Sequence, residues 1–146
     1  MNLNKEERED IVIGNKIDDE NLLINLSYKD FIVLCMMFAD KFVIPFSQTN
    51  FPKEDLNFSN LFIHGLISKE ELEKRRIDAW NRYDKLEGVD KAVQRITVCF
   101  LYPDITSKDN DYIDDFQELF LNLLLDVKNG LCSQFFNFLT THFKSR

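Results

Sequence analysis

The segment from Tyr28 to Phe42 constrains the fold more than any other part of the chain, because it is apolar on almost every side of a helix. A helix with this pattern is normally central in its domain. Its longest uninterrupted apolar run, 31–39, has nine residues, whereas a membrane span needs about 20. We therefore expect a central helix surrounded by other helices, with no membrane association.

Local signals place the ends of several helices. Ser27 is a suitable cap for the central helix, and Pro45 cannot continue it. Ser68 and Glu71 have the spacing of a capping box, in which each side chain bonds the other residue's backbone N–H. With Pro52 in a first turn and Gly65 as a stop, the predicted helices cover 28–42, 52–64, 69–87, about 109–128 and about 131–143.

Two segments leave alternatives open. A helix beginning at 5–10 and ending at Gly14 competes with a partly extended structure over 1–26. The β-branched residues of 96–100 favour a strand, but no second strong strand is present to pair with it, so we predict a helix over 89–102. The expected fold is an all-α, single-domain bundle of about six helices over residues 1–146, with a short strand within 93–101 as the alternative.

The cysteines and the first residues predict a cytoplasmic protein. Cys35, Cys99 and Cys132 are far apart and lie in apolar runs, which is typical of reduced core residues in a reducing compartment. Residues 1–10 are charged and unlike a signal peptide.

No arrangement of residues predicts catalysis, a cofactor or a metal site. The two histidines, His64 and His142, are placed where helices are expected to end, and a positive imidazole suits that end of the dipole. The four glycines are isolated, so there is no phosphate-binding loop. Asp109 begins a stretch like a calcium loop, but Asp114 stands where that loop requires glycine. We expect a protein that is not an enzyme.

Basic and aromatic residues alternate in the segment 74–83, which could stack on nucleic-acid bases. Acidic residues lie among them, however: residues 69–95 hold eight basic and seven acidic side chains. Ion pairs within the helix account for this pattern, and the net charge of −7 opposes binding to a phosphate backbone. We expect no nucleic-acid partner.

Acidic residues are concentrated between positions 104 and 118. The six are Asp104, Asp109, Asp111, Asp114, Asp115 and Glu118, against the single base Lys108. From Asp111 onward they share one face of a helix. A second acidic segment, 6–20, could add to this surface. Two interpretations stay open: a solvated face that compensates a helix dipole, or a surface that steers a basic partner.

A small, acidic, helix-rich chain without catalytic residues resembles the immunity proteins of bacterial toxin–antitoxin systems, including those of contact-dependent growth inhibition. The resemblance is one of class and extends over the whole chain. It implies a toxin domain as partner, often a nuclease whose basic cleft the acidic surface would block. We therefore expect a non-catalytic protein that neutralises a basic protein, with the six acids above as its partner-binding residues.

Two other functions stay open. The phenylalanines, notably Phe135, Phe136 and Phe138, could exceed what one core hides, which would suit a structural or regulatory protein that self-associates. The choice between monomer and homodimer is therefore open. An enzyme with an unrecognised carboxylate pair is the third alternative.

Overall fold

The computed structural model describes residues 8–144, which contain seven α-helices and no strand. They are α1 (Glu9–Asp19), α2 (Tyr28–Phe38), α3 (Phe51–Ile63), α4 (Lys69–Lys85), α5 (Gly88–Val98), α6 (Ile113–Val127) and α7 (Leu131–Lys144). The all-α class is confirmed, and 89–98 is helical, so the strand within 93–101 was the wrong alternative. No helix in the described part has the length and apolar character to cross a membrane.

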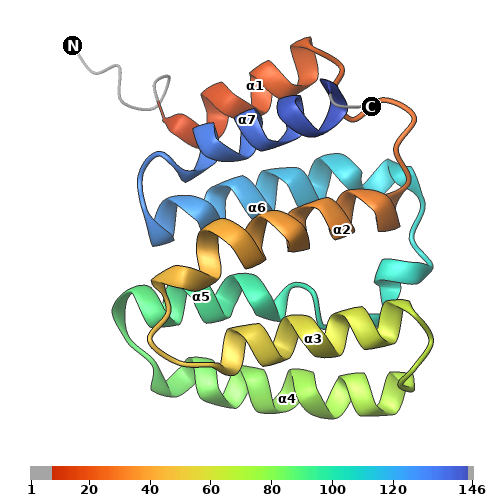
Figure 1. The fold of residues 1–146 in the computed structure, drawn as a ribbon, viewed down its shortest axis with the longest axis vertical. Coiled ribbons are helices and arrows are strands. Elements are labelled where there is room, and N and C mark those ends of the chain that lie inside the picture. Colours follow the sequence, from red (N-terminus) through yellow and green to blue (C-terminus); the bar gives the residue numbers. More distant parts are fainter. Residues whose placement is uncertain (1–7, 145–146) are drawn as a thin grey trace.

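The helices lie across the molecule in layers (Figure 1). α1 and α7 form the layer at one end, α2 and α6 the next, and α3 and α5 the one after, while α4 covers the opposite end. α5 has a central place because it packs against α6 on one side and α3 and α4 on the other. Its Val93 and Ile96 belong to the main core, whereas its Val98 joins a smaller cluster with Leu72 and Ala79 of α4.

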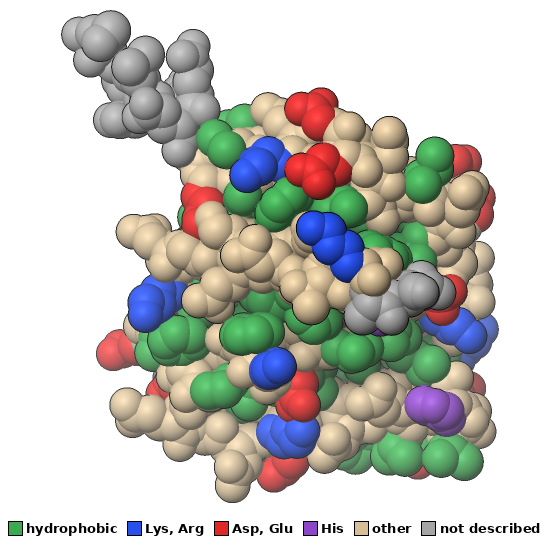
Figure 2. All heavy atoms as spheres, turned by 45° about the horizontal axis from the view of Figure 1, so that its top comes forward, with side chains coloured by type: hydrophobic (Ala, Val, Ile, Leu, Met, Phe, Trp, Pro, Cys, Tyr) green, Lys and Arg blue, Asp and Glu red, His purple; other side chains and the backbone are tan. Residues whose placement is uncertain are grey.

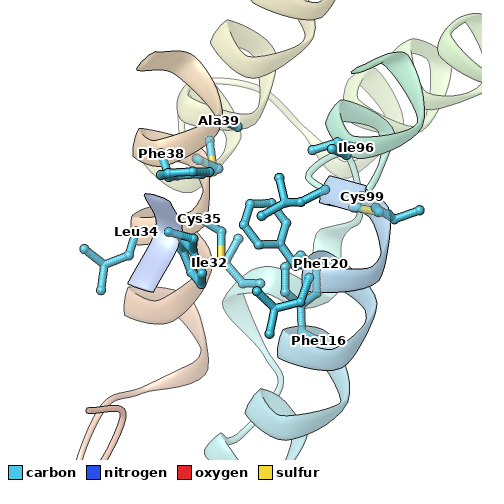
Figure 3. Close-up of a cluster of buried hydrophobic side chains, with 14 of the residues drawn as sticks. Ile32, Leu34, Cys35, Phe38, Ala39, Ile96, Cys99, Phe116 and Phe120 are labelled. Atoms are coloured by element: carbon cyan, nitrogen blue, oxygen red, sulfur yellow. The ribbon is translucent and has the colours of Figure 1, made fainter. Parts of the chain in front are cut away.

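Phenylalanine rings form the centre of the main core, where α2 meets α6 and α7. Phe38 is fully buried, and its ring lies 6.3 Å from that of Phe120 and 5.1 Å from that of Phe135. Figure 3 shows α2 side chains facing Phe116 and Phe120, with Cys99, the residue directly after α5, alongside. Such edge-to-face contacts add to the burial of area. The apolar segment 28–38 is thus central, as expected.

The predicted caps form. Ser27 Oγ accepts a hydrogen bond from the N–H of Asp30 at 3.1 Å. Ser68 and Glu71 make both bonds of the capping box, each at 3.1 Å. Gly65, beyond the end of α3, has φ 74°, a left-handed conformation that suits glycine.

The end of the central helix differs from the prediction of a helix through 42. α2 ends at Phe38 and is followed by a π-helical turn, Ala39–Val43, and a 3-10 turn, Ile44–Phe46. Pro45 lies in the second turn. It has no N–H to donate, and its ring clashes with the carbonyl four residues back in a regular helix, which explains why the α-helical pattern stops before it.

Gly14 does not end the first helix, contrary to expectation. α1 runs through it to Asp19, because a glycine inside a helix costs only about 1 kcal/mol relative to alanine. Ile13 and Ile17 are buried on either side of Gly14 and bind α1 to the core. The part of the predicted first helix at 5–7 lies outside the described residues.

Two leucines of the helices are exposed, Leu61 of α3 and Leu119 of α6. On α3 the charged Asp55 is buried instead, because α3 turns that side towards α4 and α5. Hydrophobic periodicity alone does not reveal a buried carboxylate.

Candidate functional site: an acidic groove between α1 and α6

The groove is built around a close approach of α1 and α6 at Gly14. A Cβ atom on Gly14 would lie 3.5 Å from Nε2 of Gln117 and 3.6 Å from a methyl carbon of Leu121. These are ordinary contact distances, so the space that glycine leaves is about one methyl group wide. Gln117 and Leu121 are both buried, and with Gly14 they line the middle of the groove.

The two helices run antiparallel, as contacts on either side of Gly14 establish. One turn before it, Asp10 Oδ2 accepts a hydrogen bond from Asn122 Nδ2 at 3.4 Å. One turn after it, Asp18 is close enough to Asp114 for their charges to interact. Residues 10–18 of α1 thus run alongside residues 114–122 of α6 in opposite directions.

Between these helices the surface is hollowed by a groove of about 700 Å³. Its lining consists of Arg8, Asp10, Ile11, Gly14, Asn15, Asp18, Asp114, Asp115, Gln117, Glu118, Leu119, Leu121 and Asn122. We call this the acidic groove. On the face in Figure 2, by contrast, acidic and basic side chains are scattered around a band of hydrophobic ones.

The charges in the acidic groove are unbalanced. Its only base, Arg8, is held by Asp10, with guanidinium-to-carboxylate distances of 3.2 and 2.9 Å. The other carboxylates that line it have no ion-pair partner in the described part of the chain: Asp18, Asp114, Asp115 and Glu118. We refer to these four as the groove acids.

The pKa of the Asp18 carboxyl reflects this excess of negative charge. Partial burial raises its pKa, and the negative charges of Asp114 and Asp19 raise it further. Two like charges on facing helices destabilise each other's ionised form. A cation between α1 and α6 would relieve that repulsion, so the groove favours a positively charged ligand.

Gln117 supplies an uncharged acceptor beside the groove. Its side chain is only 6% exposed, and its Oε1 atom is buried without a hydrogen-bond partner. An unsatisfied buried polar group costs about 1–3 kcal/mol. The protein therefore carries an acceptor here that its own described residues do not use.

The structure divides the six acids predicted from the sequence into two sets. Asp114, Asp115 and Glu118 lie together in the acidic groove. Asp104 instead pairs with Lys108 at 3.2 Å, in the connection before α6. Asp109 accepts the N–H of Asp111 at 2.9 Å and so caps a short 3-10 turn.

The expected helix face beginning at Asp111 therefore starts two residues too early. α6 begins at Ile113, and Asp111 belongs to the separate 3-10 turn, Asn110–Tyr112. The cap at Asp109 explains this, because its side chain satisfies a backbone N–H and starts the tighter turn. Asp111 is exposed and is not part of the groove lining.

Several groove residues were not among the predicted site residues. Asp10 and Asp18 lie in the acidic segment 6–20, which was expected to add to the surface, and they do line the groove. Glu6 and Glu7 of that segment lie outside the described residues. Gln117 and Gly14 carry no signal in the sequence, since their role depends on the pairing of α1 with α6.

The three arginines of the segment 74–83 make contacts within the fold. Asp55 of α3 is fully buried and accepts from Arg75 Nε at 2.6 Å, Arg82 at 2.9 Å and Gln94 Nε2 at 2.7 Å. Arg76 donates to the carbonyl of Leu101 at 3.0 Å. The expected ion pairs within one helix were wrong in their partners, because Arg75 and Arg82 join α4 to α3. These guanidinium groups hold helices together.

The two histidines contact residues of their own helices. Nδ1 of His64 is 2.7 Å from the carbonyl of Asn60 at the end of α3, and the His142 ring stacks on that of Phe138. Among residues 8–144, no three histidine, cysteine or acidic side chains are arranged to hold a metal ion.

Comparisons of this chain with protein-family models, curated proteins and solved structures found no match.

Proposed function

We propose that this chain is a non-catalytic binding protein that neutralises a basic protein partner by holding a basic segment in the acidic groove. The observation that carries the proposal is the set of four groove acids without ion-pair partners, placed on two facing helices. The raised pKa of Asp18, caused by burial and by Asp114, supports it because a cation would lower that repulsion.

The same charges would speed the encounter with a basic partner. Complementary potentials raise association rates to about 10⁸–10⁹ M⁻¹s⁻¹ at low salt, against about 10⁵–10⁶ for a neutral pair. The net charge of −7 acts in the same direction.

In its specific form, the proposal is an immunity protein that blocks a bacterial toxin domain, such as a nuclease, in the cytoplasm. The class resemblance supports it, as does a fold that leaves Cys35, Cys99 and Cys132 buried and unpaired. Reduced thiols suit a reducing compartment. A nuclease cleft is basic because it binds phosphates, and it would offer the acidic groove its complement.

The groove is tested with charge-neutralising variants and a fluorescent peptide of alternating lysine and glycine as probe. One variant carries Asp114→Asn, Asp115→Asn and Glu118→Gln. Its matched control carries Glu70→Gln, Glu73→Gln and Asp78→Asn, three exposed acids of α4 that change the net charge equally. We expect the groove variant to bind about tenfold more weakly at low salt and the control to bind nearly as the wild type does, since each exposed pair contributes about 0.2–1 kcal/mol. Equal losses in both variants would contradict the proposal.

The immunity form is tested by co-expression. If the reading frame upstream of this gene encodes a protein with a toxic C-terminal domain, this chain should restore growth of cells expressing that domain. The groove variant should protect less well, whereas the α4 control should protect fully. Growth arrest despite abundant folded chain would contradict the immunity form.

The phenylalanines do not support the self-associating alternative. Of the fourteen, only Phe51 is exposed, while Phe135 is fully buried and Phe136 and Phe138 pack against the main core. The main core and the smaller cluster beside α4 accommodate the other thirteen, so the excess that motivated this alternative is accounted for within one chain.

A further inference from the structure

We infer that the acidic groove is a socket for an arginine side chain of the partner, in which Gln117 Oε1 accepts a hydrogen bond from the guanidinium group. This inference rests on the proposed function, because it names the group that the groove selects. Besides the negative charges, it involves a neutral hydrogen-bond acceptor, Gln117, and the space beside Gly14. Both can be tested with variants that leave the charge unchanged.

The first step concerns the unused acceptor. Gln117 Oε1 has no hydrogen-bond partner among residues 8–144, and the Gln117 side chain lines the acidic groove. The atom of Gln117 nearest the opening at Gly14 is Nε2. The last torsion of a glutamine is roughly two-fold, so a half-turn of the amide places the oxygen there instead and presents it to a donor in the groove. Gln94 Oε1 is also unpartnered, but Asp55 holds the amide nitrogen of Gln94 in the α3–α4–α5 contact. Only Gln117 borders the groove.

The second step concerns the opening above that acceptor. Gly14 has an ordinary helical conformation, and a Cβ there would meet its neighbours at normal contact distances. Neither backbone geometry nor packing therefore requires glycine, although glycine weakens a helix. Because glycine has no side chain, it leaves space beside the Gln117 amide. A ligand group needs that space to reach the acceptor.

The third step concerns the shape and chemistry of the ligand. The Asp18–Asp114 pair lies one helical turn, about 5.4 Å, from Gly14. Ile11 and Leu119, which are 44% and 37% exposed, add apolar surface to the lining. A planar guanidinium group has five N–H donors in a fixed arrangement, so it can donate to carboxylates and to an amide oxygen at the same time. It is also weakly hydrated, so its flat face and the aliphatic part of the arginine side chain can cover apolar groups. An ammonium group is compact and more strongly hydrated, and it fits this lining less well.

The test compares two fluorescent peptides, one of alternating arginine and glycine and one with lysine in place of every arginine. They carry equal charge, so a difference in affinity reports the cation's chemistry. We expect the arginine peptide to bind the wild type about tenfold more tightly. The Gln117→Met variant, which keeps an unbranched side chain but removes the acceptor, should lose about tenfold or more for arginine and much less for lysine.

Stability measurements separate this role from a structural one. Gln117→Met removes an unsatisfied buried amide and should keep or raise the melting temperature. Gly14→Ala should raise the melting temperature and yet weaken arginine binding at least about threefold, because its methyl group fills the opening. Since this variant strengthens the helix, its weaker binding cannot come from misfolding.

The outcomes distinguish the two proposals. If both peptides bind equally and neither Gln117→Met nor Gly14→Ala changes arginine binding, the socket is wrong. Binding that still depends on Asp114, Asp115 and Glu118 would then leave the proposed function intact. If binding is indifferent to those acids as well, the proposed function fails too.

Discussion

Individual side chains in this protein are divided between holding the fold and lining a surface. Asp55 and the groove acids are both carboxylates, but Asp55 has three donors while the groove acids have none from the described protein. That difference assigns Asp55 to the stability of the fold, and it leaves the groove acids available for the binding role that we propose.

Removing the Asp55 charge should strongly destabilise the fold. Asp55→Asn leaves the guanidinium groups of Arg75 and Arg82 without their buried counter-charge, and breaking a buried pair costs about 3–5 kcal/mol. Urea unfolding measures the loss. Glu54→Gln is the matched control: Glu54 also pairs with Arg75, at 3.3 Å, but is half exposed, so its loss should be below about 1 kcal/mol. Similar losses for both variants would contradict the structural role of Asp55.

Glu9 connects α1 to the start of α7 through hydrogen bonds that its ionised carboxylate accepts. Its Oε1 accepts from the N–H of Gly130 at 2.9 Å, and its Oε2 from Ser133 Oγ at 2.7 Å. Burial raises the pKa of Glu9, but the bonds from Ser133 and Gly130 outweigh it, so the pKa is lower than the ordinary 4.5. Glu9 therefore stabilises the fold above the unfolded pKa, and this contribution disappears as the pH falls through the folded pKa.

Glu9→Gln should thus cost about 1 kcal/mol at neutral pH, because the ionised acceptor of the α7 N-terminus is lost. The difference between wild type and variant should shrink to near zero in acid, below the folded pKa of Glu9. Urea unfolding of both proteins across this range measures it. A difference that is constant with pH would show that the charge of Glu9 does not stabilise this contact.

At the scale of elements, the glycines show where sequence signals determine a helix end and where they do not. Gly65 adopts φ 74° after α3, whereas Gly14 lies inside α1. Gly14→Ala should stabilise the protein by about 0.5–1 kcal/mol, because alanine favours a helix more than glycine does. Gly65→Ala should destabilise it by about 1 kcal/mol, because alanine is strained at a positive φ and the added methyl group would gain no contacts there. Thermal unfolding of the two variants tests this. Shifts of the same sign would contradict the assignment.

Helix starts were largely predictable because their causes are local. Ser68 and Glu71 bond within one turn, and Pro52 needs only its fixed φ in a first turn. The end of α2 was predicted incorrectly because the chain changes to a π-helical turn and a 3-10 turn before Pro45, instead of staying α-helical up to residue 42. The passage of α1 through Gly14 was missed because it depends on the burial of Ile13 and Ile17. The buried Asp55 was missed because its partners Arg75 and Arg82 are distant in sequence.

At the scale of the whole molecule, the acidic groove exists because the first helix packs against the sixth. The sequence contains both acidic segments, and half of the six predicted site acids do meet in the groove. Gly14 and Gln117 could not be predicted, because nothing local states that α1 crosses α6 at that point. Because the two helices run antiparallel, with Asp10 and Asn122 hydrogen-bonded at one end, the two acidic stretches lie side by side and form one surface.

The central claim, that the acidic groove binds a basic segment, is tested most directly by mapping where such a segment binds. Isotope-labelled protein would be titrated with the alternating lysine–glycine peptide, and backbone amide shifts recorded by NMR. We expect the largest changes at residues 10–18 of α1 and 114–122 of α6, and their loss with increasing salt. Changes centred on α4, or spread evenly over all exposed acids, would contradict the claim.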